Sequence, residues 1–200
     1  MTRLFIVRHG NTFASGELPR RIGARTDLAL TGTGESQAEA LGAHFAAQGI
    51  RFSTVFAGAL RRTQQTAALI LAAQAAPLPV VTADFLTEID HGPDEDKTED
   101  LVLARVGAEA LAAWDSAAVP PPGWAVDPDA RIAAWRAFAA TAEGDTLLVT
   151  SNGAARFALL ALVAPEARPA AIKLRTGAYG IITGDSSGAY RLSDWDKRPG

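Results

Sequence analysis

The sequence contains no cysteine and has only a small excess of charge of one sign. Without cysteine the chain can form no disulfide framework, no thiolate metal site and no thiol nucleophile. The formal net charge of −3 disfavours a general binder of nucleic acid or of anionic membranes, although a local basic pocket is compatible with it. We therefore expect a small-molecule partner, with no nucleic acid and no membrane. No sequence feature assigns an oligomeric state.

Long apolar runs are also missing. No run reaches the roughly 20 residues that a membrane-spanning helix requires, and the run after Arg3 is too short for the core of a signal peptide. We therefore expect a cytoplasmic protein. The 200 residues, 48% of them hydrophobic, suit a single α/β domain over 1–200 with one core.

Short apolar runs alternate with segments of helical periodicity, which is typical of a sheet covered by helices on both faces. The runs predict strands at 3–8, 53–57, 79–82, 146–150 and 179–183, with "AYRLSDW" as a later antiparallel edge strand. Apolar residues share one helical face in three segments: Ala38, Leu41 and Phe45; Ala67, Ile70 and Leu71; Ile132, Trp135, Phe138 and Ala139. We assign these stripes to the core of a mostly parallel α/β fold.

Residues 84–124 break this alternation. The segment begins with the acidic run "DFLTEIDHGPDEDKTED", continues through an Ala- and Leu-rich stretch, and ends in "VPPPGW". The proline run could be a domain linker, but the pieces on either side are too short to hold separate cores. We therefore expect an inserted lobe or lid within the domain.

Three polar clusters follow predicted strands. Residues 8–12 read Arg-His-Gly-Asn-Thr after the first strand, Arg61 and Arg62 begin the helix after the second, and Ser151-Asn152-Gly153 follow a late strand. Ligands of open parallel sheets bind beyond the carboxyl ends of the strands, where helices begin. Guanidinium groups and helix N-termini converging there suit a phosphate group. Taken singly, each residue also has an ordinary structural explanation: a solvated arginine, or a hydrogen-bonded histidine at a strand end.

Together, these motifs resemble the histidine phosphatase superfamily, which includes the cofactor-dependent phosphoglycerate mutases. The resemblance rests on "RHGNT", "LRRTQQTA", "LTEIDHG" and "LLVTSNG", which occur in the family's order and cover nearly the whole chain. It implies a phosphoglycerate mutase-like fold and a reaction through phosphohistidine without metal or other cofactor.

The resemblance also implies roles for individual residues. His9 would be the nucleophile, since a neutral imidazole can attack phosphorus. Arg8 and Arg62 would hold the phosphoryl oxygens, and Glu88 would be the general acid and base. Further phosphate-binding residues would be Asn11, Thr12, Arg21, Asn152 and Gly153. Because Arg20 lies next to Arg21, the resemblance leaves open which of the two arginines reaches the phosphate. Without the motif, Glu88 would be interpreted as one more solvated acid.

The chain departs from the family at Asn152, where members typically carry a second histidine in "SHG". Asparagine can donate one amide N–H to phosphate but cannot carry a positive charge. Because asparagine is a favourable helix N-cap, structure alone could account for it. His44 lies in an amphipathic helix and is expected at the surface, whereas His91 could lie near the pocket mouth and replace the missing imidazole.

The sequence thus favours a phosphomonoester phosphatase that acts on a small phosphorylated metabolite, slowed by Asn152. Two alternatives remain open. A phosphoglycerate mutase uses the same site, although the family's mutases tend to be longer in the lid region. A catalytically weakened phospholigand-binding or regulatory protein is the other.

Overall fold

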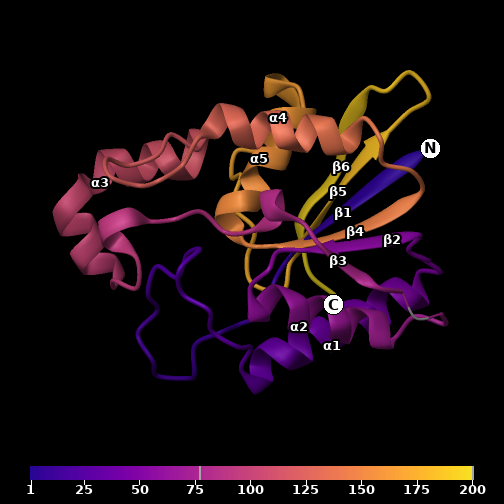
Figure 1. The fold of residues 1–200 in the computed structure, drawn as a ribbon, viewed down its shortest axis with the longest axis horizontal. Helices are drawn as coiled ribbons and strands as arrows, with labels where there is room; N and C mark the ends of the chain where they lie inside the picture. Colours follow the sequence, from indigo (N-terminus) through magenta and orange to yellow (C-terminus); the bar gives the residue numbers. More distant parts are fainter. Residues whose placement is uncertain (77, 200) are drawn as a thin grey trace.

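The computed structural model describes residues 1–76 and 78–199, which form one six-stranded sheet with helices on both faces (Figure 1). The strands are β1 (Thr2–Arg8), β2 (Thr54–Ala57), β3 (Val80–Thr82), β4 (Asp145–Thr150), β5 (Tyr179–Gly184) and β6 (Tyr190–Lys197). Their order across the sheet is β3-β2-β4-β1-β5-β6. The first four are parallel, β5 is antiparallel to β1, and β6 is antiparallel to β5. The predicted mostly parallel α/β sheet with an antiparallel edge strand is confirmed.

Helices α1 (Gly32–Ala47) and α2 (Arg61–Ala72) cover one face, and α4 (Pro128–Ala139) and α5 (Asn152–Leu162) cover the other. The two faces alternate along β1, as expected for a strand with period two. Phe5 and Val7 pack with α1 and α2, whereas Leu4 and Ile6 pack with α4 and α5. The three apolar stripes predicted from helical periodicity are buried or packed against these clusters.

Residues 84–124 fold as two short 3₁₀ turns, η1 (Asp84–Leu86) and η2 (Gly92–Asp94), followed by α3 (Glu99–Ala117). Helix α3 reaches beyond the end of the sheet (Figure 1). It is interrupted at Gly107, whose φ of 81° is a left-handed conformation that side chains disfavour. A third 3₁₀ turn, η3 (Pro165–Ala167), follows α5. Whether the inserted segment acts as a lid stays a prediction.

The pairing of β1 with β4 brings the first and third polar clusters to the same level. Arg8 pairs with Thr150 in the parallel register, and the His9 backbone N–H donates to the Thr150 carbonyl at 3.0 Å. A Cβ on Gly10 would lie 2.2 Å from the Gly34 carbonyl oxygen, so only glycine lets the chain pass the first turn of α1 here. The residues that follow β1 and β4 therefore lie side by side at the same end of the sheet.

Candidate active site

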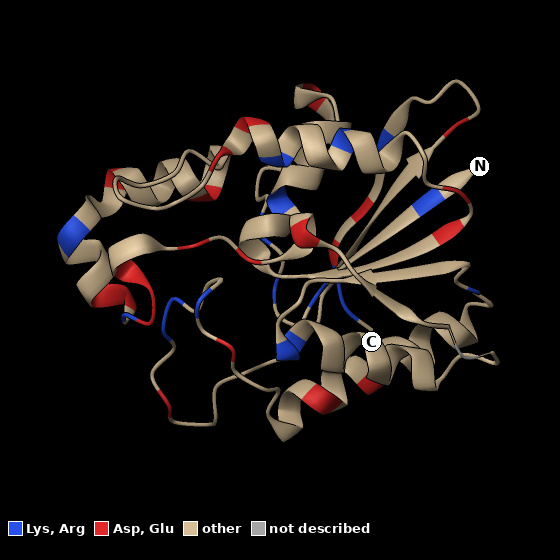
Figure 2. Cartoon of the chain, viewed as in Figure 1, with Lys and Arg blue, Asp and Glu red and all other residues tan. Residues whose placement is uncertain are grey.

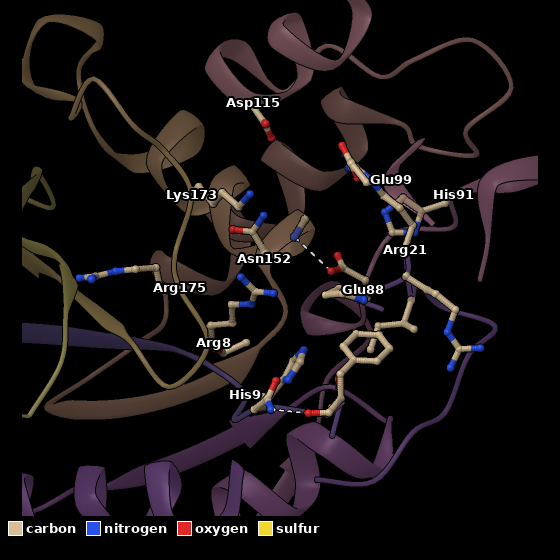
Figure 3. Close-up of a pocket in the computed structure, with 18 of the residues that line it drawn as sticks. Arg8, His9, Arg21, Glu88, His91, Glu99, Asp115, Asn152, Lys173 and Arg175 are labelled. Carbon is tan, nitrogen blue, oxygen red and sulfur yellow. Dashed lines mark hydrogen bonds and ion pairs between the residues drawn. The ribbon is translucent and has the colours of Figure 1, made fainter. Parts of the chain in front are cut away.

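A cavity of about 650 Å³ lies beyond the carboxyl ends of β1 and β4 (Figure 3). The predicted site residues that line it are Arg8, His9, Asn11, Thr12, Arg21, Glu88, Asn152 and Gly153. Basic residues gather around these strand ends (Figure 2). Eight of the nine predicted site residues thus border one cavity, and Arg62 is the exception.

His9 lies at the end of β1 and is only 3% exposed. Its Nδ1 is 2.8 Å from the Gly10 carbonyl oxygen. Because a carbonyl can only accept, Nδ1 carries the proton and Nε2 keeps its lone pair. Burial, and then the charges of Arg62 and Arg8, hold the pKa of His9 well below 6.5. The imidazole is therefore neutral at neutral pH, with Nε2 as its nucleophilic atom.

Arg8 presents a guanidinium to the same cavity. Its Nη1 donates to the Leu174 carbonyl at 2.6 Å, and its Nε is buried without a hydrogen-bond partner among the described residues. Burial lowers its pKa to about 10, which still leaves it charged at neutral pH. Arg8 therefore keeps donors for an anion in the cavity.

Arg62 is fully buried on α2, whereas Arg61 beside it is exposed, as a helical step of about 100° requires. The Arg62 guanidinium donates to the carbonyls of Thr26 at 2.6 Å and Gly23 at 3.1 Å. It does not line the cavity, and whether it holds a phosphoryl oxygen stays a prediction. Its charge still lowers the pKa of His9, so it lies within electrostatic reach of the nucleophile.

Glu88 is 7% exposed and is fixed at both carboxylate oxygens. Oε1 accepts the Ile89 backbone N–H at 2.9 Å, and Oε2 accepts the Gly153 N–H at 3.2 Å. Arg131 supports this segment by donating to the Thr87 carbonyl at 2.7 Å. The general-acid candidate is therefore held between the inserted segment and the first turn of α5.

Asn152 is the first residue of α5, and Ser151 occupies the N-cap position. The explanation of Asn152 as a cap is therefore wrong. Its Oδ1 accepts the Leu174 backbone N–H at 2.9 Å, which orients the amide and leaves Nδ2 for another acceptor. Asn152 thus ties the 172–176 loop to the helix and offers one neutral donor to the cavity.

Asn11 and Thr12 follow His9 along the cavity wall. The Asn11 side chain donates to the Phe13 carbonyl at 2.6 Å, and its backbone N–H donates to Gln37 Oε1 at 2.9 Å. Thr12 is 8% exposed and lines the cavity. Asn11 is therefore partly committed to shaping the loop.

Arg20 and Arg21 both border the cavity and differ in their ion-pair partners, and which of them reaches a phosphate stays a prediction. Arg20 pairs with Glu17 and Asp96. Arg21 borders the cavity, stacks over Trp124, and forms a two-pronged ion pair with Glu99 of α3 at 2.6 and 2.9 Å. The more enclosed arginine is therefore already engaged by an acid of the inserted segment.

The other two histidines differ from each other. His91 is buried and borders the cavity, with its ring against Trp124 and its Nδ1 3.5 Å from Glu95 Oε2. His44 is partly exposed on α1 and hydrogen-bonds Tyr179 Oη at 2.9 Å. Whether His91 takes part in chemistry stays a prediction.

Sequence reasoning missed several residues around the cavity: Trp114, Asp115, Lys173 and Arg175 line it, and Glu95 supports it from behind. Burial alone would raise the pKa of Glu95, but hydrogen bonds from His91, Thr26 and Gly23 lower it to about 2. Only the alternation of "AIKLR" hinted at Lys173 and Arg175. Nothing in the sequence indicated that the side chain of Glu95 is buried, because a single acid within an acidic run is expected to be solvated.

Within residues 1–76 and 78–199, no group of three His, Asp or Glu side chains is placed to hold a metal ion. No helix in the described part of the chain is long and apolar enough to cross a membrane.

The sequence of the chain is similar to those of known proteins. The sequence model of the histidine phosphatase superfamily (branch 1) matches residues 4–196. A 2,3-bisphosphoglycerate-dependent phosphoglycerate mutase of Methylobacterium sp. (strain 4-46) is 38% identical over 126 residues, which are 62% of this chain and 60% of that protein. The mutase of the same description from Brucella anthropi is 30% identical over 164 residues, 78% of this chain and 79% of that one.

Solved structures show the same fold. A candidate alpha-ribazole-5'-P phosphatase from Escherichia coli is similar with a TM-score of 0.73 and 26% identity, covering 98% of this chain and 97% of that one. A mycobacterial glucosyl-3-phosphoglycerate phosphatase gives a TM-score of 0.78 at 20% identity, covering 98% and 99% of the two chains.

Proposed function

Because the chain belongs to the histidine phosphatase superfamily, we propose that it is a phosphomonoester phosphatase that works through a phosphohistidine on His9. The observation that carries the proposal is the state of His9. Its Nδ1 is held by the Gly10 carbonyl, its pKa is lowered by burial and two arginines, and its Nε2 is left for the cavity. A buried neutral imidazole beside guanidinium groups suits nucleophilic attack on a bound phosphoryl group.

In the first step, the Nε2 lone pair forms a bond to phosphorus while the bond from phosphorus to the ester oxygen breaks. Glu88 in its protonated form gives its proton to that oxygen, so an alcohol leaves and a carboxylate remains. Arg8 and the Asn152 amide donate to the phosphoryl oxygens, and buried Arg62 contributes charge. Asn11, Thr12 and the Gly153 backbone surround the same space.

In the second step, water attacks the phosphohistidine. The Glu88 carboxylate takes a proton from the water, the nitrogen–phosphorus bond breaks, and inorganic phosphate leaves with His9 again neutral. The two steps use no metal and no other cofactor. Asn152 contributes no positive charge, so we expect a slow enzyme. We propose that its substrate is a small phosphorylated metabolite of the cytoplasm.

The inserted segment 84–124 carries Glu88. It also carries Glu99, the acid that pairs with Arg21. We assign it the role of a lid or lobe over the cavity. Because Arg21 can pair either with Glu99 or with a substrate oxygen, exchange between these partners would couple substrate binding to the position of α3.

Phosphoglycerate mutase is the second candidate, because the relatives matched by sequence bear that description. The Brucella relative is aligned over nearly equal shares of the two chains, so chain length does not separate the two functions. In a mutase the phosphohistidine passes its phosphoryl group to a hydroxyl of the phosphoglycerate, and the site must hold the bisphosphate intermediate so formed, whereas a phosphatase passes the group to water. Assaying 3-phosphoglycerate with and without 2,3-bisphosphoglycerate separates them: isomerisation to 2-phosphoglycerate indicates a mutase, and release of phosphate indicates a phosphatase.

The proposal is tested by a phosphatase screen over a panel of phosphometabolites with wild type and His9→Ala. Turnover that disappears in His9→Ala supports it. Binding of phosphate without turnover of any substrate would instead favour a phospholigand-binding protein.

A further inference from the structure

The loop before β5 forms one wall of the cavity. Burial alternates along residues 171–175, with Ile172 and Leu174 in the core and Lys173 and Arg175 exposed. An extended chain points successive side chains in opposite directions. Lys173 and Arg175 therefore face the same side, and both border the cavity.

This wall is fastened by the site itself. The Leu174 N–H donates to Asn152 Oδ1 at 2.9 Å, and the Leu174 carbonyl accepts from Arg8 at 2.6 Å. The Leu174 side chain is fully buried. Two residues of the proposed phosphoryl site thus hold the backbone of Leu174 at both its N–H and its carbonyl, and fix the chain that carries Lys173.

Lys173 differs from the other cations of the cavity in its partners. Three of them are ion-paired: Arg20, Arg21 and Arg175. Arg198 donates to the Thr176 carbonyl at 2.8 Å. Across the residues that the structure describes, Lys173 makes no side-chain hydrogen bond or ion pair, although it lies beside Asn152 at the cavity (Figure 3).

Asp115, an acid that also lines the cavity, does not pair with Lys173. The Asp115 carboxylate, also at the cavity, lies 3.8 Å from Arg156 Nη2, and Arg156 is fully buried beneath Trp114. A phosphomonoester dianion is matched by the charges of Arg8 and Arg62 near His9. Lys173 therefore adds a positive charge beyond what one phosphoryl group requires.

We propose that Lys173, held by the clamp on Leu174, forms a second anion subsite, so that the substrate is a phosphomonoester bearing a second anionic group such as a carboxylate. The inference rests on the proposed function, because it takes the first phosphoryl group to lie at His9. It assigns Lys173 to substrate selection and not to the chemical step.

Matched ligands test the subsite by binding, without requiring turnover. In each of two pairs, one compound has a carboxylate that the other lacks: 2-phosphoglycolate with ethyl phosphate, and 3-phosphoglycerate with glycerol 3-phosphate. Calorimetry with wild type, Lys173→Met and Lys197→Met gives the affinity of each. Lys197 is an exposed lysine of β6 outside the cavity, so its variant controls for loss of one positive charge.

We expect wild type and Lys197→Met to prefer the carboxylate member of at least one pair by about tenfold, the size of one charge-assisted contact. In Lys173→Met this preference disappears, while affinity for the member without the carboxylate changes less than about twofold. Equal weakening of both members, or an unchanged preference, overturns the subsite. A protein that shows the preference but hydrolyses nothing would overturn the proposed phosphatase and leave the subsite standing.

Discussion

Gly153 donates its backbone N–H to Glu88 Oε2 at 3.2 Å, and the space above its Cα is filled by the same carboxylate. A Cβ on Gly153 would lie 2.3 Å from Glu88 Oε1 and 2.9 Å from Ile89 Cγ1. The first turn of α5 and the proposed acid are therefore placed by direct contact.

Gly153→Ala should displace the Glu88 carboxylate and lower kcat by on the order of 10²-fold, because misplacing a reacting group by about 1 Å has that effect. Steady-state kinetics and the melting temperature measure the change. Gly32→Ala is the control, since a Cβ there meets nothing within 4 Å. A Gly153→Ala enzyme with wild-type kcat would show that Glu88 is not the proton donor.

Arg8→Ala and Arg62→Ala should each lower kcat/KM by roughly 10² to 10³ and weaken inhibition by phosphate or vanadate. Arg62→Ala should also lower the melting temperature, because it leaves the Thr26 and Gly23 carbonyls without their donor. Exposed Arg61→Ala serves as the matched control. An inactive Arg61 variant beside an active Arg62 variant would contradict the placement of α2.

The lowered pKa of His9 predicts the pH dependence of stability. In the unfolded chain the histidine takes up a proton near pH 6.5, whereas the buried imidazole resists protonation until lower pH. The contribution of His9 is thus complete above about pH 6.5 and is lost as the pH falls towards the folded pKa, by up to about 1.4 kcal/mol per pH unit. Urea unfolding of wild type and His9→Gln between pH 8 and 5 measures it. Parallel curves for the two proteins would refute the buried neutral imidazole.

Asn152→His should raise kcat, because a second imidazole can add a charged donor where Asn152 offers a neutral one. The gain is at most roughly 3 kcal/mol, about 10² in rate. Disturbing the hydrogen bond to Leu174 should cost about 1 kcal/mol of stability, so the melting temperature is measured with the rate. A folded variant that binds phosphate as before and turns over no faster would show that position 152 does not limit the rate. The double variant Asn152→His with His91→Ala then tests whether His91 has replaced the imidazole.

Sequence alone could predict the fold because its signals are local. Runs such as "LFIV" identify buried strands, and the stripe of Ala38, Leu41 and Phe45 identifies a helix face. The order of strand and helix then places polar residues at the carboxyl edge of the sheet, where His9 and Asn152 are found.

The partners of individual side chains could not be predicted, because they depend on loops that meet only in the folded chain. Arg62 faces carbonyls 36 and 39 residues away, and Asn152 binds the backbone of a residue 22 positions further on. Nothing in the local pattern distinguishes a guanidinium that shapes a loop from one that faces a cavity.

The central claim is the covalent intermediate on His9, and trapping it is the most direct test. Wild type is mixed briefly with a ³²P-labelled phosphomonoester that it hydrolyses, quenched in alkali, and mapped by peptide. We predict label on the peptide that contains His9, stable in base and labile in acid, and no label in His9→Ala. Acid-stable label on serine or threonine, or undiminished turnover by His9→Ala, would contradict the account.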